Sequence, residues 1–248
     1  MKRLLPIIIC ALLPLLLMSL REPVAPDIAK VRDEVTNPAS KHYYPKLMAQ
    51  YERNETIMTL DEFRLLYLGA MFAEDFNPYR TSPYAAVVED LYFKSHHSGR
   101  ECDEIIKYAQ LSLQDDPFNL QQIDYLIYAL REKKKNNLAN IWQFRLNHLL
   151  EAIVSTGTGL DREHAWYVIN PKHEYFLLNK MGRIATDFKF EEPWYDHITV
   201  EPKGPKDSTD YYFNSRHFLE QYRLKFPIDE EEEELTEEEY GPLDVDNN

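Results

Sequence analysis

Apolar side chains recur at helical spacing between residues 43 and 155. Five stretches each place apolar residues three and four positions apart, which puts them on one face of an amphipathic helix. The clearest positions are Leu60, Phe63 and Tyr67; Val87, Val88 and Leu91; Ile105, Ile106 and Leu113; Ile123, Leu126 and Leu130; and Leu146, Leu149 and Ile153. Because each stripe covers one side only, we expect the helices to pack as antiparallel hairpins joined by short turns.

Helix start signals precede several of these stretches. Thr59 and Glu62 form a capping box, in which the hydroxyl and the carboxylate each bind a free backbone N–H group. Ser82 and Pro83 are typical of an N-cap and a first helical residue. The segment Ile105–Ala129 weakly resembles one tetratricopeptide-type unit, but the period of roughly 34 residues is faint. The pattern therefore favours helical hairpins over a true repeat array.

The pattern changes at residues 156–159, where Gly alternates with Thr. Beyond this point, aromatic and β-branched residues cluster in short runs, which is typical of strands. The predicted strands are Ala165–Ile169, His173–Leu178, Trp194–Val200 and Tyr211–Phe213, with Phe218–Phe226 as a short helix or irregular cover. The sequence predicts an α+β protein in which a small antiparallel β-sheet follows the helical hairpins and docks on them.

Composition and periodicity together divide the chain into five segments. These are a signal peptide or retained anchor (1–20), a linker or loosely docked lead-in (21–42), a helical-hairpin domain (43–155), a small β-rich part (156–226) and an acidic disordered tail (227–248).

The first twenty residues predict export. Positive charge at Met1–Arg3 precedes the apolar run Leu4–Leu20, the layout of a secretory signal. At ~1.5 Å per residue, this run falls short of a hydrocarbon core of ~30 Å. No A-x-A motif precedes Arg21, so a retained anchor stays open as an alternative to cleavage. A lipid-modified Cys10 is less favoured, because large apolar residues surround it.

Cysteine usage fits an exported protein without disulfides. Once Cys10 is removed, Cys102 is the one remaining thiol, so no internal disulfide can form. Cys102 shares a helical face with Ile105 and Ile106, which predicts core packing; a reactive thiol is the alternative.

The negative charge is concentrated at the C-terminal end. The net charge is −14, and residues 229–248 contain eleven acidic side chains and no Lys or Arg, which leaves −3 for the rest of the chain. Without a basic stripe, nucleic acid and anionic lipid head groups are poor partners. We expect the tail to be solvated; cation binding or docking on a basic partner are the alternatives.

No motif in the sequence specifies a reaction. It lacks G-x-S-x-G, H-E-x-x-H, P-loop and G-x-G-x-x-G signatures, so no catalytic residue, cofactor or metal site is predicted. His173-Glu174 begins like a zinc-binding helix, but Leu177 stands where the second His is needed. Asp196 and His197 point to opposite faces of a predicted strand and cannot share one metal ion.

Other residues carry a family resemblance. They are Tyr44-Pro45, Leu47, Tyr51, Thr56, Thr59-Leu60, Glu62-Phe63, Leu66-Tyr67, Gly69 and Pro78-Tyr79, and later Ala165, Val168-Ile169, Glu174-Tyr175 and Tyr212–Asn214. Over about residues 43–215 the chain resembles exported bacterial proteins of unknown function that are common in Bacteroidetes, the domain-of-unknown-function family 4919. The resemblance implies a Gram-negative envelope location, but no activity and no site residues.

Three functional hypotheses follow. The first is a non-enzymatic exported module that binds an envelope protein through its helical surface. The second is a glycan- or cell-wall-binding module, in which Trp166, Trp194 and Tyr195 offer exposed rings to sugars, although aromatic residues on strands more often face a core. The third is an enzyme whose site is assembled from distant residues. Nucleic acid is not an expected partner, and membrane contact is expected only through an uncleaved N-terminal segment.

Overall fold

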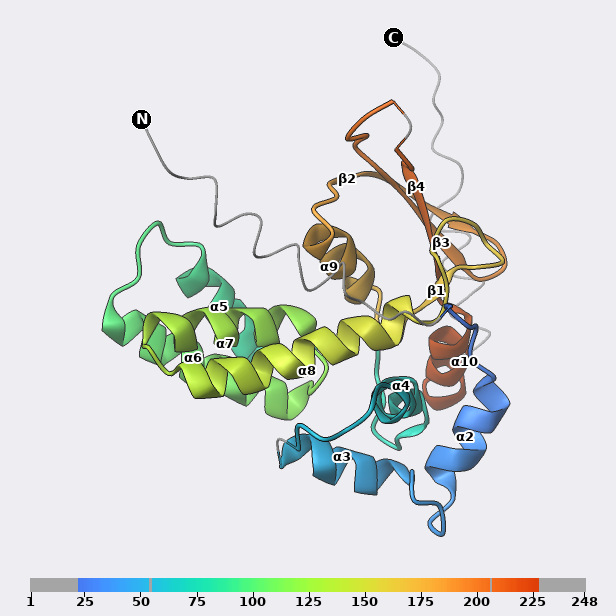
Figure 1. Cartoon of the computed structure of the whole chain (residues 1–248), viewed down its shortest axis with the longest axis horizontal. Helices are drawn as coiled ribbons and strands as arrows, with labels where there is room; N and C mark the ends of the chain where they lie inside the picture. Colours follow the sequence, from blue (N-terminus) through green and yellow to red (C-terminus); the bar gives the residue numbers. More distant parts are fainter. Residues whose placement is uncertain (1–21, 54, 206, 228–248) are drawn as a thin grey trace.

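The computed structural model describes residues 22–227 apart from positions 54 and 206. In this part of the chain, nine α-helices and a four-stranded sheet form an α+β fold (Figure 1). The first seven α-helices and one 3₁₀-helix are α2 (Ile28–Thr36), α3 (Tyr44–Glu52), α4 (Leu60–Gly69), η1 (Ala70–Phe72), α5 (Pro83–Tyr92), α6 (Gly99–Asp115), α7 (Leu120–Glu132) and α8 (Asn136–Val154). The five predicted helices correspond to α4–α8 and are confirmed.

The caps at the helix starts explain where these helices begin. Before α4, the Thr59 N–H donates to Glu62 Oε2 at 2.8 Å and the Glu62 N–H donates to Thr59 Oγ1 at 3.3 Å, which confirms the capping box. Ser82 caps α5 as expected. Helix α5 ends at Tyr92, and Ser98 forms a second capping box that starts α6.

The described part of segment 21–42 contains α2, a helix that the sequence pattern did not predict. Val31 and Val35 are buried, and they lie four residues apart on one face of α2. Ahead of α2, the Val24 N–H donates to the Ser155 carbonyl at 2.9 Å, and Arg64 Nη2 donates to the Val24 carbonyl at 2.9 Å. These contacts attach the segment to α4 and to the end of α8, while the boundaries of the five segments stay predictions.

The sheet is mixed and not purely antiparallel. Its strands are β1 (Trp166–Tyr167), β2 (Ala185–Glu191), β3 (Tyr195–Val200) and β4 (Asp210–Asn214), in the order β1-β4-β3-β2. The pairs β2–β3 and β3–β4 are antiparallel, but β1 runs parallel to β4. Strands β1, β3 and β4 overlap predicted strands, whereas β2 was not predicted.

The predicted strand His173–Leu178 is wrong, because these residues lie in helix α9 (Lys172–Lys180). Pro171 precedes the helix, and the Lys172 N–H donates to Asn170 Oδ1 at 2.9 Å. Its buried side chains follow helical spacing, which places Glu174 and Leu178 on one face. Of the two alternatives for Phe218–Phe226, a short helix or an irregular cover, the structure has the helix, α10 (Arg216–Lys225).

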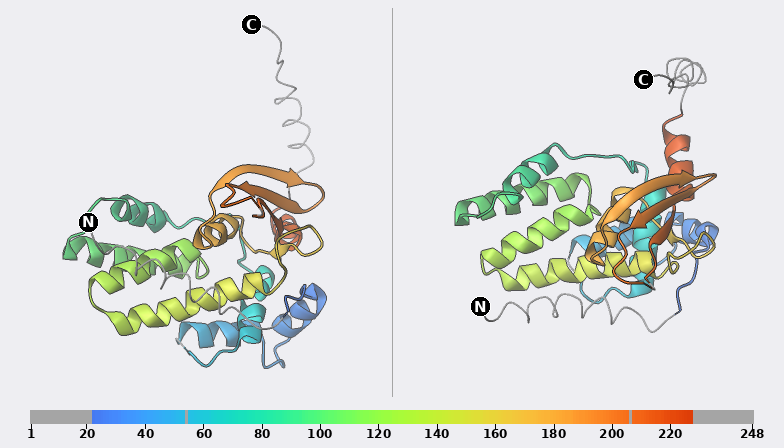
Figure 2. Two further views of the ribbon diagram at one scale, coloured as in Figure 1. Left: turned by 45° about the horizontal axis from the view of Figure 1, so that its top comes forward. Right: turned by 90° about the horizontal axis from the view of Figure 1, so that it is seen from above.

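Helix α9 lies between the sheet and the array of α5–α8 (Figures 1 and 2). Helices α5, α6, α7 and α8 pack in sequence as antiparallel neighbours, and α4 crosses onto α8. One hydrophobic core runs through both parts, from Tyr67 and Leu126 of the helices to Leu177 and Phe213. Cys102 is buried in this core, as predicted. None of the described helices is both long and apolar enough to cross a membrane.

Gly159 packs tightly against Trp166 of β1, the strand that follows α8. Gly159 has a φ of +70°, and a Cβ there would lie 2.5 Å from Trp166 Cε3. Trp166 itself stacks on Tyr211 with a ring-centroid distance of 5.6 Å and donates its Nε1–H to the Gly157 carbonyl at 2.9 Å. The indole therefore cannot move away without breaking contacts of its own.

Replacing Gly159 by Ala should lower the free energy of unfolding by about 2–4 kcal/mol, because it adds both backbone strain and a clash. Urea denaturation measures the effect. Gly204→Ala is the matched control, since nothing lies within 4 Å of a Cβ at that position. Equal stability of the two variants would contradict the packing described for Trp166.

Candidate functional site

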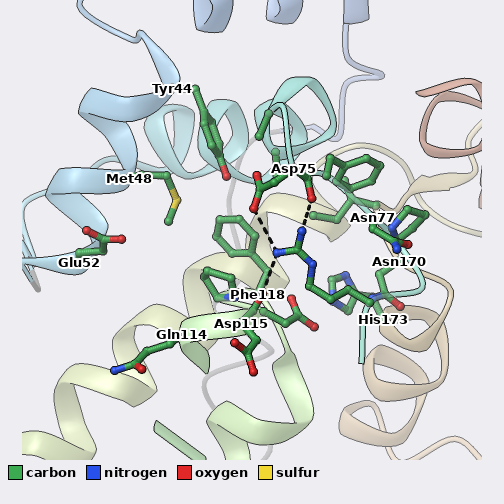
Figure 3. A pocket seen from close by; sticks show the side chains of 18 residues that line it. Tyr44, Met48, Glu52, Asp75, Asn77, Gln114, Asp115, Phe118, Asn170 and His173 are labelled. Carbon is green, nitrogen blue, oxygen red and sulfur yellow. Dashed lines mark hydrogen bonds and ion pairs between the residues drawn. The ribbon is translucent and has the colours of Figure 1, made fainter. Parts of the chain in front are cut away.

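A pocket of about 270 Å³ lies where the helical hairpins meet the C-terminal part (Figure 3). We call it the junction pocket. Figure 3 shows Met48 and Glu52 on one side of it and Asn170 and His173 on the other. Its lining residues are Tyr44, Met48, Glu52, Ala70, Ala73, Asp75, Phe76, Asn77, Pro78, Arg80, Gln114, Asp115, Asp116, Pro117, Phe118, Ile169, Asn170 and His173.

Arg80 ties the rim of the junction pocket together. Its Nη1 donates to Asp75 Oδ2 at 3.1 Å and to the Asp115 carbonyl at 3.0 Å, and its Nη2 donates to the Asp75 carbonyl. Ser82 Oγ donates to Asp115 Oδ2 at 2.6 Å. These bonds hold the loop after η1 against the end of α6, so the pocket is built into the fold.

Carboxyl groups dominate the charge of the junction pocket. Its described lining residues include four carboxyl groups (Glu52, Asp75, Asp115 and Asp116) and one guanidinium, that of Arg80. Lys172, Lys225 and Arg145 lie close by, next to Asp116, Asp75 and Glu52 respectively, but none of the three lines the pocket.

Asp116 is the acid that lies deepest in this wall. Burial raises the pKa of its carboxyl group, and hydrogen bonds from Asn119 and the Phe118 backbone oppose that shift, as do the charges of Arg80 and Lys172. The rings of Tyr44, Phe76 and Phe118 line the same space. Negative charge beside aromatic rings favours a cationic ligand, since both attract positive charge.

His173 closes the inner end of the pocket and is held in one protonation state. Its Nδ1 lies 2.7 Å from Tyr67 Oη, which also accepts the Ile169 N–H at 3.3 Å. The imidazole also donates a hydrogen bond to the Phe118 backbone. Because a neutral ring has one N–H group and Nδ1 lies against Tyr67, this proton is on Nε2, and Nδ1 accepts a hydrogen bond from the Tyr67 hydroxyl. Burial lowers the pKa of His173 to about 3. The ring is neutral at physiological pH, and both of its nitrogens are occupied.

A buried carboxyl pair lies behind the pocket, next to His173. Glu174 on α9 is fully buried, and none of the described N–H or O–H groups reaches either of its oxygens. Burial raises the pKa of Glu174 well above its usual range, and the charge of Asp196 adds to the shift. Burial also raises the pKa of Asp196, while hydrogen bonds from Glu174 and Ser215 oppose the rise. Glu174 therefore keeps its proton and donates it to Asp196.

The three residues proposed for glycan binding do not form an exposed platform. Trp166 is 5% exposed and packs against Tyr211 in the core. Trp194 and Tyr195 are half-buried, and arginine side chains lie over their rings. Trp166 therefore has no open face to offer a sugar.

Sequence reasoning did not find the junction pocket. Its residues come from four separated stretches of chain, and no motif links Glu52, Arg80, Asp116 and His173. The available signal was the helical spacing of apolar residues after Pro171, which places His173 and Leu177 on one buried face. Within the described ranges, no group of three or more His, Cys, Asp or Glu side chains is arranged to hold a metal ion.

A family model described as a domain of unknown function (DUF4919) matches residues 29–224. The chain belongs to this family. The match spans every lining residue of the junction pocket as well as Glu174 and Asp196. No curated protein and no solved structure matches the chain significantly. The family expected from the sequence is confirmed, and it brings no known activity to the pocket.

Replacing Glu174 by Gln should make stability less dependent on pH. The folded protein holds a carboxyl proton that the unfolded chain loses as the pH rises above about 4.5, so wild-type stability falls from there upward. The Gln amide donates to Asp196 without titrating. We expect Glu174→Gln to be more stable than wild type by ~1–3 kcal/mol at pH 8, with a smaller difference toward pH 4.5.

Urea denaturation between pH 4.5 and 8 measures this difference. Titration of His173 acts on both proteins and cancels in the comparison. The matched control is Glu163→Gln, the same change at an exposed position. A stability difference that does not vary with pH would show that Glu174 is ionised in the folded protein.

Proposed function

We propose that this protein is an exported, non-enzymatic interaction protein of the cell envelope, and that its junction pocket binds a cationic side chain of a partner protein. The observation that carries the proposal is the excess of carboxyl groups over cations in a pocket with aromatic walls. A Lys or Arg side chain satisfies both features, because it pairs with carboxylates and packs over aromatic rings.

The state of His173 supports binding over acid–base catalysis. A general base needs a free nitrogen and a pKa near the working pH. His173 has a pKa of about 3, and its nitrogens bond Tyr67 and the Phe118 backbone. The ring therefore shapes the pocket and is not free to exchange protons with a ligand.

A second hollow extends the junction pocket along the helical surface. It has a volume of about 560 Å³ and shares Glu52, Gln114 and Pro117 with the pocket. It continues to Trp142 and Leu138 on α8, and Leu138 is 49% exposed. A partner segment with a cationic residue in the pocket can place an apolar residue against α8. This extended surface supports recognition of a peptide segment through the helices.

Export and envelope location rest on the sequence. The charged start Met1–Arg3 and the apolar run Leu4–Leu20 support them, and both lie outside the described residues. A glycan-binding function ranks lower, because the burial of Trp166 leaves two half-buried rings from the set of three.

An NMR titration with capped tripeptides tests the proposal. Acetyl-Gly-Lys-Gly-amide should bind at the junction pocket, and the norleucine analogue, which has no charge, should bind at least 10-fold more weakly. Glu52→Gln and Asp116→Asn should each weaken binding of the lysine peptide about 5-fold, equivalent to about 1 kcal/mol. Added salt should weaken binding of the lysine peptide to the wild type, because it screens the charges.

Asp90→Asn is the matched control, because it removes one negative charge from an exposed position of α5 that does not line the pocket. It should leave the affinity unchanged. Equal binding of the lysine and norleucine peptides, or equal effects of Asp90→Asn and Asp116→Asn, would contradict the proposal.

A further inference from the structure

Strand β2 lies at one edge of the sheet, and no other strand of the described residues pairs with its outer side (Figure 1). On β3, the even-numbered residues bond to β4: the Val200 N–H donates to the Thr209 carbonyl at 2.7 Å, and the Ser215 N–H donates to the Trp194 carbonyl at 3.0 Å. The odd-numbered residues of β3 therefore direct their backbone groups toward β2, since these groups alternate along a strand.

The same alternation defines the free edge of β2. Asp187, Lys189 and Glu191 lie opposite the odd-numbered residues of β3 and bond to it. Phe188 and Phe190 consequently point their backbone N–H and C=O groups away from the sheet. The Phe188 N–H has no partner in the described strands and donates to Oδ1 of the adjacent Asp187 at 2.9 Å. The Asp187 carboxylate thus accepts a backbone hydrogen bond that the carbonyl group of a neighbouring strand can accept instead.

The side chains along this edge are exposed on both faces. Phe188 and Phe190 are 48% and 43% exposed on one face. Asp187 and Lys189 are exposed on the other face, with opposite charges two residues apart. Lys189 Nζ has a weak contact with Glu191 at 3.5 Å, and Glu191 is itself paired with Arg162.

We infer that β2 is the surface through which two copies of this chain associate, with their β2 strands paired antiparallel about a two-fold axis at Phe188. In this register Phe188 lies opposite Phe188 of the second copy, and Asp187 lies opposite Lys189 of the second copy. The backbone bonds form at the outward-facing residues. The charged pairs occupy the positions between them, where side chains approach more closely.

The charges select this register and a copy of the same chain. Moving the axis to Lys189 places the two Lys189 side chains opposite each other and Asp187 opposite Glu191. Moving it to Asp187 places the two Asp187 side chains opposite each other. Both alternatives oppose like charges, and charged residues on an open edge normally prevent pairing. Moving the axis to Phe190 places Lys189 opposite Glu191, but Glu191 is already paired with Arg162 and its side chain is only 9% exposed. The axis at Phe188 joins the two exposed charges, Asp187 and Lys189, in two ion pairs. This inference does not depend on the junction pocket.

Charge reversal tests the inference by sedimentation equilibrium on the protein as it is processed in the cell, between 1 and about 300 μM. The wild type should show a monomer–dimer equilibrium. Asp187→Lys and Lys189→Asp should each weaken association at least 10-fold, because each opposes like charges twice in the dimer. The double variant Asp187→Lys/Lys189→Asp restores both pairs with reversed polarity and should associate like the wild type. A monomeric wild type, or a double variant no better than the single variants, would overturn the inference.

Hydrogen exchange locates the contact. The amides of Phe188 and Phe190 should exchange more slowly in concentrated than in dilute samples, whereas the amides of Asp187 and Lys189, which face β3, should exchange alike in both. A dimer without added protection at Phe188 and Phe190 would show that another surface mediates association. Thermal midpoints of the variants confirm that the substitutions at these exposed positions leave the fold intact.

Discussion

The hydrogen bond between Tyr67 and His173 connects the two parts of this protein. Tyr67 belongs to α4, and His173 belongs to α9, the helix that lies between the sheet and the helical hairpins. Both side chains are buried, and the Tyr67 hydroxyl donates its hydrogen bond to Nδ1 of the neutral imidazole. An unpaired polar group at this depth is costly, so the bond fixes how α9 sits against the helices.

The position of α9 accounts for the features around it. One residue further along, Glu174 faces β3 and shares its proton with Asp196, which fastens α9 to the sheet. On the other side, His173 forms the inner end of the junction pocket. His173 therefore has no free nitrogen for proton transfer, while the carboxyl groups of Glu52 and Asp116 line the same pocket. This combination is compatible with the proposed recognition of a cation.

The sequence predicts the fold best where one physical pattern dominates. Helices α4–α8 have long apolar stripes and clear caps, and they were predicted. Helix α2 buries only Val31 and Val35 among nearby prolines, so its pattern resembled a linker. Helix α9 contains aromatic residues and follows the aromatic and β-branched run Trp166–Ile169, a composition that is typical of strands. Strand β2 is exposed on both faces, which removes the burial signal that marks a strand.

The junction pocket and the pairing of Glu174 with Asp196 depend on tertiary contacts between residues far apart in the chain. Neither spacing nor composition reports that Glu52, Asp116 and His173 meet, and a single sequence contains no signal for such proximity. The family assignment, in contrast, follows from residues spread along the helices and strands and is confirmed over residues 29–224.

The most direct test of the account is the protonation state of His173, measured by ¹⁵N NMR of the imidazole ring between pH 8 and pH 4.5. The account predicts a neutral ring with its proton on Nε2 and no titration in this range, because its pKa is about 3. Titration near pH 6.5, or a proton on Nδ1, would show that His173 is open to proton exchange and that the pocket is built for chemistry and not for binding alone.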